Sequence, residues 1–132
     1  MVDLNRYYSA GMNNTLLIKN ISGVSYASPY VKIFEKTLID RWYLGDFLSA
    51  DYTFVSSFDA YNKEIIKSTI VATVDLAKII IYSRLSTRTE LIDLDAVVNE
   101  SYVDVFIKLK KEKLQGLDVT YRVEYFNNPN PL

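Results

Sequence analysis

Polarity alternates almost residue by residue in two segments near the end of the chain, Tyr102–Lys110 and Leu117–Tyr125. In the first segment Val103, Val105, Ile107 and Leu109 fall on one side, and Asp104, Lys108 and Lys110 fall on the other. In the second, Leu117, Val119, Tyr121, Val123 and Tyr125 alternate with Asp118, Thr120, Arg122 and Glu124. Because successive side chains of a β-strand point to opposite sides, each segment predicts a half-buried strand. The residues between them are polar and end in Gly116, which favours an antiparallel hairpin.

Similar patterns predict further strands, at Leu16–Ile21, Val31–Asp40, Ala50–Phe58, Glu64–Thr73, Ala77–Leu85 and Leu91–Val98. Glu64–Thr73 and Ala77–Leu85 are apolar enough to be central strands. Val31–Asp40 also fits a helical face, but we favour a strand because it lacks a good N-cap and is rich in β-branched residues. Pro29 predicts a loop within Tyr26–Tyr30.

About seven or eight strands at a spacing of about ten residues are typical of sandwiches and closed barrels. We therefore expect an all-β protein with an antiparallel β-sandwich fold. A jelly-roll topology is one of the arrangements that fit this pattern. The expected organisation is an N-terminal arm at residues 1–15, the sandwich at 16–126 and a C-terminal tail at 127–132. The tail ends regular structure because Pro129 and Pro131 cannot serve an interior ladder.

The composition of the chain limits which partners, catalytic groups and cofactors we expect. In 132 residues, 49% are hydrophobic, enough for one continuous core, and 15 basic residues nearly balance 16 acidic ones. This balance favours neither nucleic acid nor an anionic membrane as a partner. Cysteine and histidine are absent, which excludes thiolate catalysis and the commonest general base and metal ligand, so we expect no cofactor. The first eight residues lack the pattern of a secretory signal, so we expect a soluble protein.

Two carboxylate pairs are candidates for hydrolytic chemistry, Asp93 with Asp95 and Asp40 with Asp46. Asp93 and Asp95 lie on the polar side of a predicted strand, where a solvated face is the more common explanation. Asp40 precedes Arg41 near a turn, which favours a cap or an ion pair. A lysine cluster at Lys108, Lys110, Lys111 and Lys113 could contact a phosphate, but it is better explained as protection of an edge strand. We expect no enzymatic activity.

Aromatic residues supply the candidate contact sites. Trp42 with Tyr43 could stack on sugar rings, although a lone tryptophan beside Leu44 and Phe47 is more often buried in a core or an interface. Tyr7 and Tyr8 could anchor the arm on a neighbouring subunit, with a frayed terminus as the alternative.

Residues 37–47 (TLIDRWYLGDF) and 49–54 (SADYTF), with a later run at 98–105 (VNESYVDV), resemble small β-rich virion structural proteins of contractile-tailed bacteriophages. The resemblance covers about residues 37–126. It implies a non-catalytic assembly subunit of the virion, in the tail, baseplate, neck or capsid surface. Its partners would be other virion proteins, with homo-oligomers expected. The expected interface residues are Tyr7, Tyr8, Trp42, Tyr43, Pro129 and Pro131. The alternative is a binding module for a host glycan or another receptor.

Overall fold

The predicted all-β sandwich is confirmed. The computed structural model describes residues 24–110 and 116–130, which form nine strands and no helix. They are β1 (Val24–Ala27), β2 (Val31–Ile33), β3 (Thr37–Tyr43), β4 (Phe47–Ser57), β5 (Lys63–Ala72), β6 (Ala77–Ser86), β7 (Ile92–Asn99), β8 (Tyr102–Leu109) and β9 (Leu117–Asn127). All pairings between them are antiparallel.

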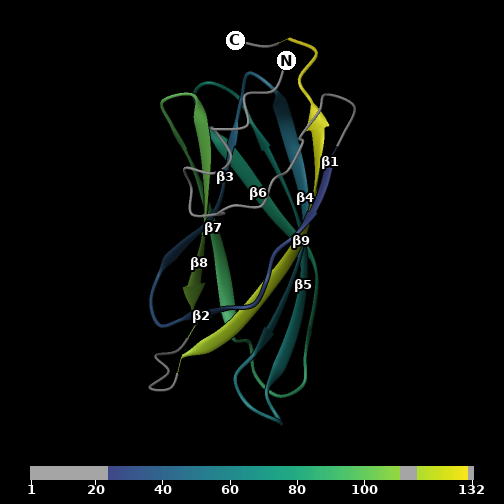
Figure 1. Ribbon diagram of the computed structural model, residues 1–132, viewed down its shortest axis with the longest axis vertical. Coiled ribbons are helices and arrows are strands. Elements are labelled where there is room, and N and C mark those ends of the chain that lie inside the picture. The colour runs from purple at the N-terminus through teal and green to yellow at the C-terminus, as the bar shows by residue number, and fades with distance from the viewer. Residues whose placement is uncertain (1–23, 111–115, 131–132) are drawn as a thin grey trace.

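The strands form two packed sheets of unequal width (Figure 1). Sheet A has the order β1-β9-β4-β5-β6, with β2 also paired to β9, and sheet B has the order β3-β8-β7. Within sheet A the spatial order β9-β4-β5-β6 is a Greek key, because three consecutive strands are followed by a distant fourth that lies beside the first. Since sheet B has three strands and sheet A six, sheet B covers only part of sheet A.

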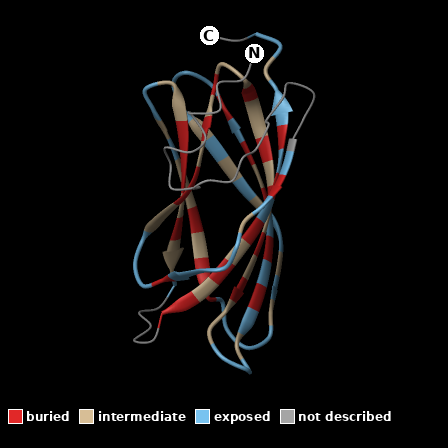
Figure 2. Ribbon diagram, in the orientation of Figure 1, coloured by how far each residue is buried: buried red, intermediate tan, exposed pale blue. Residues whose placement is uncertain are grey.

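The buried positions lie mainly on strands of the two packed sheets (Figure 2), and the core that they form is rich in aromatic residues. Its largest fully buried side chains include Trp42 from β3, Phe47, Tyr52 and Phe54 from β4, and Tyr125 from β9. The rings of Phe47 and Tyr125 stack with centroids 4.9 Å apart, which is a favourable geometry for aromatic pairs. The period-two pattern of β4 and β9 predicted their buried faces correctly.

The hairpin predicted between the last two strands is wrong. β8 pairs with β3 and β7 in sheet B, whereas β9 pairs with β1, β2 and β4 in sheet A. The connection between β8 and β9 therefore crosses from one sheet to the other. An alternating pattern shows which face of a strand is buried but does not identify the neighbouring strand.

Two other strand predictions and one loop prediction are corrected. Val31–Asp40 is divided between β2 and β3, which lie in different sheets and are separated by a bend at residues 34–36. The loop predicted at Tyr26–Tyr30 begins only at Ser28, because β1 continues to Ala27. β6 was predicted to be central, yet it pairs only with β5 and forms an edge of sheet A among the described residues. The predicted strand Leu16–Ile21 and arm 1–15 lie outside the described residues.

Candidate functional site

A buried carboxyl group joins the two sheets. Asp40 on β3 is fully buried, and its Oδ2 accepts hydrogen bonds from the hydroxyls of Tyr52 on β4 and Tyr125 on β9, each at 2.6 Å. A bulge in β3 between Leu38 and Asp40 explains its position, because the extra residue lets Ile39 and Asp40 both face the core. We call Asp40, Tyr52 and Tyr125 the Asp40 cluster.

The electrostatics of the Asp40 cluster suit a structural link. Burial, followed by the negative charge of Asp40, holds the pKa values of Tyr52 and Tyr125 well above their ordinary value. Both phenols therefore keep the protons that they donate to Asp40. The cluster has no opening to solvent, so Asp40 is not placed to act on a bound substrate, and it does not form the site that was considered for Asp40 with Asp46.

A second buried carboxyl group, that of Glu64, ties β5 to β6 and to the start of β7. Its Oε2 accepts hydrogen bonds from Arg84 Nη1 at 2.9 Å and Ser86 Oγ at 2.6 Å. Its Oε1 accepts hydrogen bonds from the backbone N–H groups of Leu91 and Ile92, both at 3.1 Å. The Glu64 side chain is fully buried, so this pairing with Arg84 satisfies a charge that would be costly alone.

The carboxyl groups of Asp93 and Asp95 lie on the outer side of β7, as predicted, and each faces a cation. Asp95 accepts a hydrogen bond from Lys36 at 3.1 Å, and this bond lowers the pKa of Asp95. Asp93 lies 3.9 Å from both Arg84 and Lys110. Separate ion pairs thus engage these two acids, which argues against a shared catalytic role.

Asp104 lies on the outer side of β8, as predicted, but it is buried, because Arg41 on β3 covers it and contacts both of its oxygens, at 2.6 Å and 3.1 Å. The hydrogen bond that Arg41 donates to Asp104 raises the pKa of Arg41. The outer face of sheet B is therefore held together by cross-strand ion pairs.

Trp42, which was expected at an interface and considered as a platform for sugars, is buried in the core, the alternative that its neighbours Leu44 and Phe47 favoured. The Trp42 side chain is 0% exposed and its ring lies 6.4 Å from that of Tyr125, so it can stack neither on a sugar nor on a neighbouring chain. Tyr43 points to the other side of β3, is half-buried and lies 5.3 Å from the Tyr102 ring. Pro129 is exposed. Tyr7, Tyr8, Pro131, Lys111 and Lys113 lie outside the described residues.

A group of exposed hydrophobic side chains gathers on two neighbouring strands and the turn between them. We call this the β5–β6 surface, and its members are Ile65, Val71, Val74, Leu76, Ile80, Tyr82 and Leu85. Ile80 is 62% exposed and Leu85 is 69% exposed, and Leu85 lies directly opposite Ile65. The sequence pattern did not predict this surface, because a long apolar run predicts burial on both faces.

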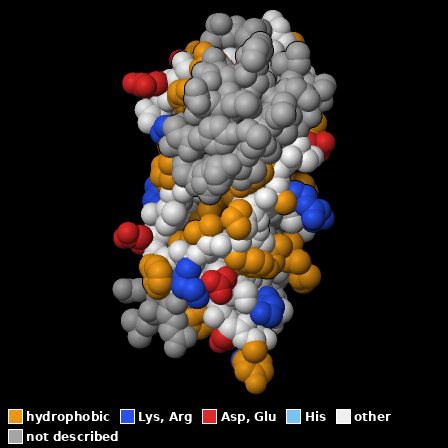
Figure 3. Space-filling model, viewed as in Figure 1, with side chains coloured by type: hydrophobic (Ala, Val, Ile, Leu, Met, Phe, Trp, Pro, Cys, Tyr) orange, Lys and Arg blue, Asp and Glu red, His pale blue; other side chains and the backbone are white. Residues whose placement is uncertain are grey.

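Positive charge predominates on the β5–β6 surface. Lys63, Lys67 and Lys78 are exposed, Glu64 is buried and paired with Arg84, and Asp75 in the turn is an exposed acid. Elsewhere both signs are mixed: Figure 3 shows lysine, arginine and acidic side chains interspersed with hydrophobic ones over the described part of one face. The β5–β6 surface thus combines apolar contact area with a few cations, as protein contact surfaces do.

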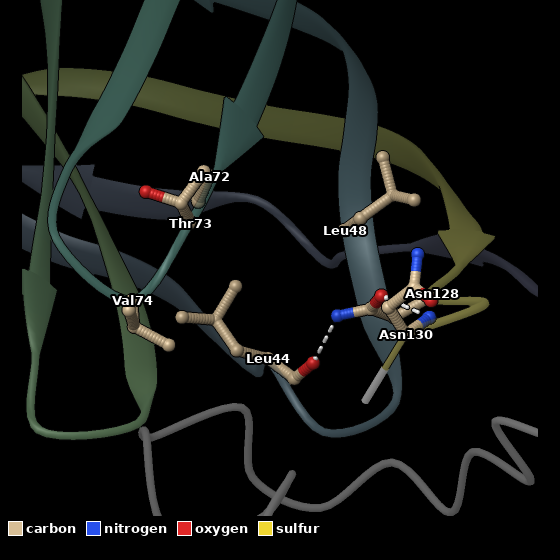
Figure 4. A pocket seen from close by; sticks show the side chains of 7 residues that line it. All are labelled: Leu44, Leu48, Ala72, Thr73, Val74, Asn128 and Asn130. Atoms are coloured by element: carbon tan, nitrogen blue, oxygen red, sulfur yellow. Dashed lines mark hydrogen bonds between the residues drawn. The ribbon is translucent and has the colours of Figure 1, made fainter. Parts of the chain in front are cut away.

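A shallow pocket of about 290 Å³ opens at the end of the sandwich, where the β3–β4 and β5–β6 turns meet the chain after β9 (Figure 4). It is lined by Leu44, Leu48, Ala72, Thr73, Val74, Asn128 and Asn130. Asn128 closes one side by donating a hydrogen bond from Nδ2 to the Leu44 carbonyl at 2.7 Å. No charged group lines the pocket. It could therefore accommodate an apolar side chain, but its lining contains no catalytic acid or base.

The described residues contain neither a metal site nor a membrane-spanning helix. The chain has no histidine or cysteine, so a cluster of metal ligands of these classes would consist of Asp and Glu. Among the described residues, no group of three or more of these acids is arranged to hold a metal ion. No helix in this part of the chain is long and apolar enough to cross a membrane.

Comparisons with known proteins find similarity among solved structures. No protein-family model matches the sequence, and no curated protein matches it either. Among solved structures, the chain is similar to the crystal structure of the Acinetobacter phage vB_ApiP_P1 tailspike protein, with a TM-score of 0.35 and 11% sequence identity. The similarity covers 88% of this chain, which spans 23% of the length of that tailspike protein.

Proposed function

We propose that this chain is a non-catalytic structural subunit of a bacteriophage virion, placed in the tail, baseplate, neck or capsid surface and acting through contacts with other virion proteins. The observation that carries the proposal is the β5–β6 surface. Monomeric proteins seldom leave large contiguous apolar patches exposed, and a patch rimmed by polar residues is typical of a protein contact site.

The buried polar links support a rigid, load-carrying role. The Asp40 cluster joins the sheets through their middle, and the Glu64–Arg84 pair fixes the edge of sheet A next to β7. Both links would hold the β5–β6 surface in a fixed shape before it meets a partner. Preorganisation of this kind lowers the entropic cost of association.

The resemblance of residues 37–126 to small structural proteins of contractile-tailed phages supports the virion assignment. The arrangement of the carboxyl groups supports the absence of catalysis, because Asp40, Asp93 and Asp95 each accept hydrogen bonds or face cations within the fold. With Trp42 buried, the glycan-binding alternative loses its proposed platform.

Quantitative mass spectrometry of purified phage particles from the source of this sequence tests the proposal. We expect the chain to be present in a fixed ratio to the major tail or capsid protein, and to stay bound after washing in high salt. Detection in the infected-cell lysate but not in washed particles would refute the proposed function. A known virion protein and a known early non-structural protein of the same phage serve as the positive and negative controls.

A further inference from the structure

The sequence of β6 does not match its place at the edge of sheet A. Ile79, Ile80 and Ile81 form an uninterrupted apolar run, a pattern typical of strands that are covered on both faces. In the fold, Ile79 and Ile81 face sheet B but are only half-buried, while Ile80 on the other face is 62% exposed. β6 therefore has the composition of a central strand without the neighbours of one.

The other edges carry the features that normally keep edges from pairing. At the opposite edge of sheet A, β1 and β2 have only four and three residues. In sheet B, β3 has a bulge, and β7 places Asp93 and Asp95 along its outer side. β6 is ten residues long and contains no proline; its register with β5 is regular from Ala77 to Ile81 and shifts at a bulge just after Ile81. The regular segment Ala77–Ile81 is the least protected stretch of these edges.

We propose that β6 pairs with β6 of a second copy of this chain, antiparallel and centred on Ile80, so that a two-fold dimer turns both edge strands into central ones. The inference deepens the proposed function and rests on it only in treating the β5–β6 surface as a contact surface.

The order of side chains along β6 selects this register. An antiparallel pair must set outward residues against outward residues, because a one-residue slip would place them on opposite faces. With Ile80 on the axis, Ile80 meets its own copy, Ile79 meets Ile81, and Lys78 lies opposite the exposed Tyr82 ring. A lysine over an aromatic ring is a favourable contact.

Disulfide formation tests the register directly because the chain has no cysteine. Directly opposed residues of an antiparallel pair have Cα atoms about 4.5 to 5.5 Å apart, within the range that a disulfide spans. We therefore expect Ile80→Cys to form a covalent dimer under mild oxidation, at a level at least about tenfold above the control Ser83→Cys. In the proposed register the two copies of position 83 lie six residues, or about 20 Å, apart.

A second pair of variants tests the dimer without a covalent bond. Ile80→Lys would set two lysines against each other on the axis, so we expect its dimer dissociation constant to rise at least about tenfold in light scattering and sedimentation. Val97→Lys, at an exposed hydrophobic position on sheet B, is the matched control and should leave the dimer intact. Circular dichroism of both variants establishes that the sandwich is folded.

The outcomes separate this inference from the proposed function. A monomer at all concentrations, or equal cross-linking of Ile80→Cys and Ser83→Cys, would overturn the inference, as would a dimer that Ile80→Lys leaves unchanged. If such a protein were still found in washed particles, the proposed function would stand and the occupant of the β6 edge would be a different virion protein.

Discussion

The Tyr125 hydroxyl on β9 donates a 2.6 Å hydrogen bond to Oδ2 of Asp40 on β3, which joins the two sheets through residues 85 positions apart in the chain. Tyr52 donates to the same oxygen at the same distance. Both donors and the acceptor are fully buried, so none of these groups can form a replacement hydrogen bond with water when its partner is removed.

Replacing Asp40 with alanine should therefore destabilise the fold strongly. The change removes the acceptor of two buried hydroxyls, and each unsatisfied group costs about 1 to 3 kcal/mol, so we expect the free energy of unfolding to fall by about 3 kcal/mol or more. Urea denaturation measures the change. Asp118→Ala is the control, because the Asp118–Lys32 ion pair is largely exposed and should contribute at most about 1 kcal/mol. Equal effects of the two substitutions would contradict the importance of the Asp40 cluster.

The same tyrosines should make the protein sensitive to high pH. The pKa values of Tyr52, Tyr121 and Tyr125 are raised in the fold, chiefly by burial, whereas an unfolded tyrosine titrates near pH 10. Above about pH 10 the unfolded state loses protons that the folded state keeps, so stability is complete below that pH and falls above it. The slope is at most about 1.4 kcal/mol per pH unit for each tyrosine.

Urea midpoints measured between pH 8 and pH 12 test this prediction. Tyr52→Phe should reduce the slope above pH 10, because one buried phenol no longer contributes. Tyr30→Phe, which alters an exposed side chain, is the matched control and should leave the slope unchanged. A stability that stays constant through pH 12 would show that the buried phenols do not control unfolding in base.

Removing the partner of Glu64 should be costly as well. In Arg84→Met the buried Glu64 carboxyl group loses its cation, and breaking a buried pair typically costs about 3 to 5 kcal/mol. Lys110→Met removes the exposed ion pair with Glu90 and should cost less than about 1 kcal/mol. Thermal and urea unfolding of both variants provide the comparison, and a small effect of Arg84→Met would mean that water or another group reaches Glu64.

One substitution should stabilise the protein. Glu100 has a φ of +61° in the two-residue turn between β7 and β8, where Asn99 and Tyr102 are paired. A side chain at positive φ costs about 1 kcal/mol relative to glycine, so Glu100→Gly should raise the free energy of unfolding by about that amount. Ser101→Gly, at the neighbouring position without a positive φ, should instead be neutral or destabilising. Differential scanning calorimetry distinguishes the two.

Particular residues show how far the sequence could be interpreted. The alternation in Leu117–Tyr125 predicted the buried face of β9, because the period of two is a property of the strand itself. The bulge that turns Asp40 into the core could not be predicted, because it depends on how β3 aligns with β8. For the same reason Glu64 attracted no attention, since its partners on β6 and β7 lie 20 to 28 positions away.

The sequence by itself determined the fold class and the inward faces of β4, β7, β8 and β9, since both follow from local side-chain geometry. Only the tertiary structure decided that β8 and β9 lie in different sheets, that Trp42 is buried and that β6 lies at an edge. Those outcomes depend on pairings between distant segments, which a local pattern of polarity does not encode.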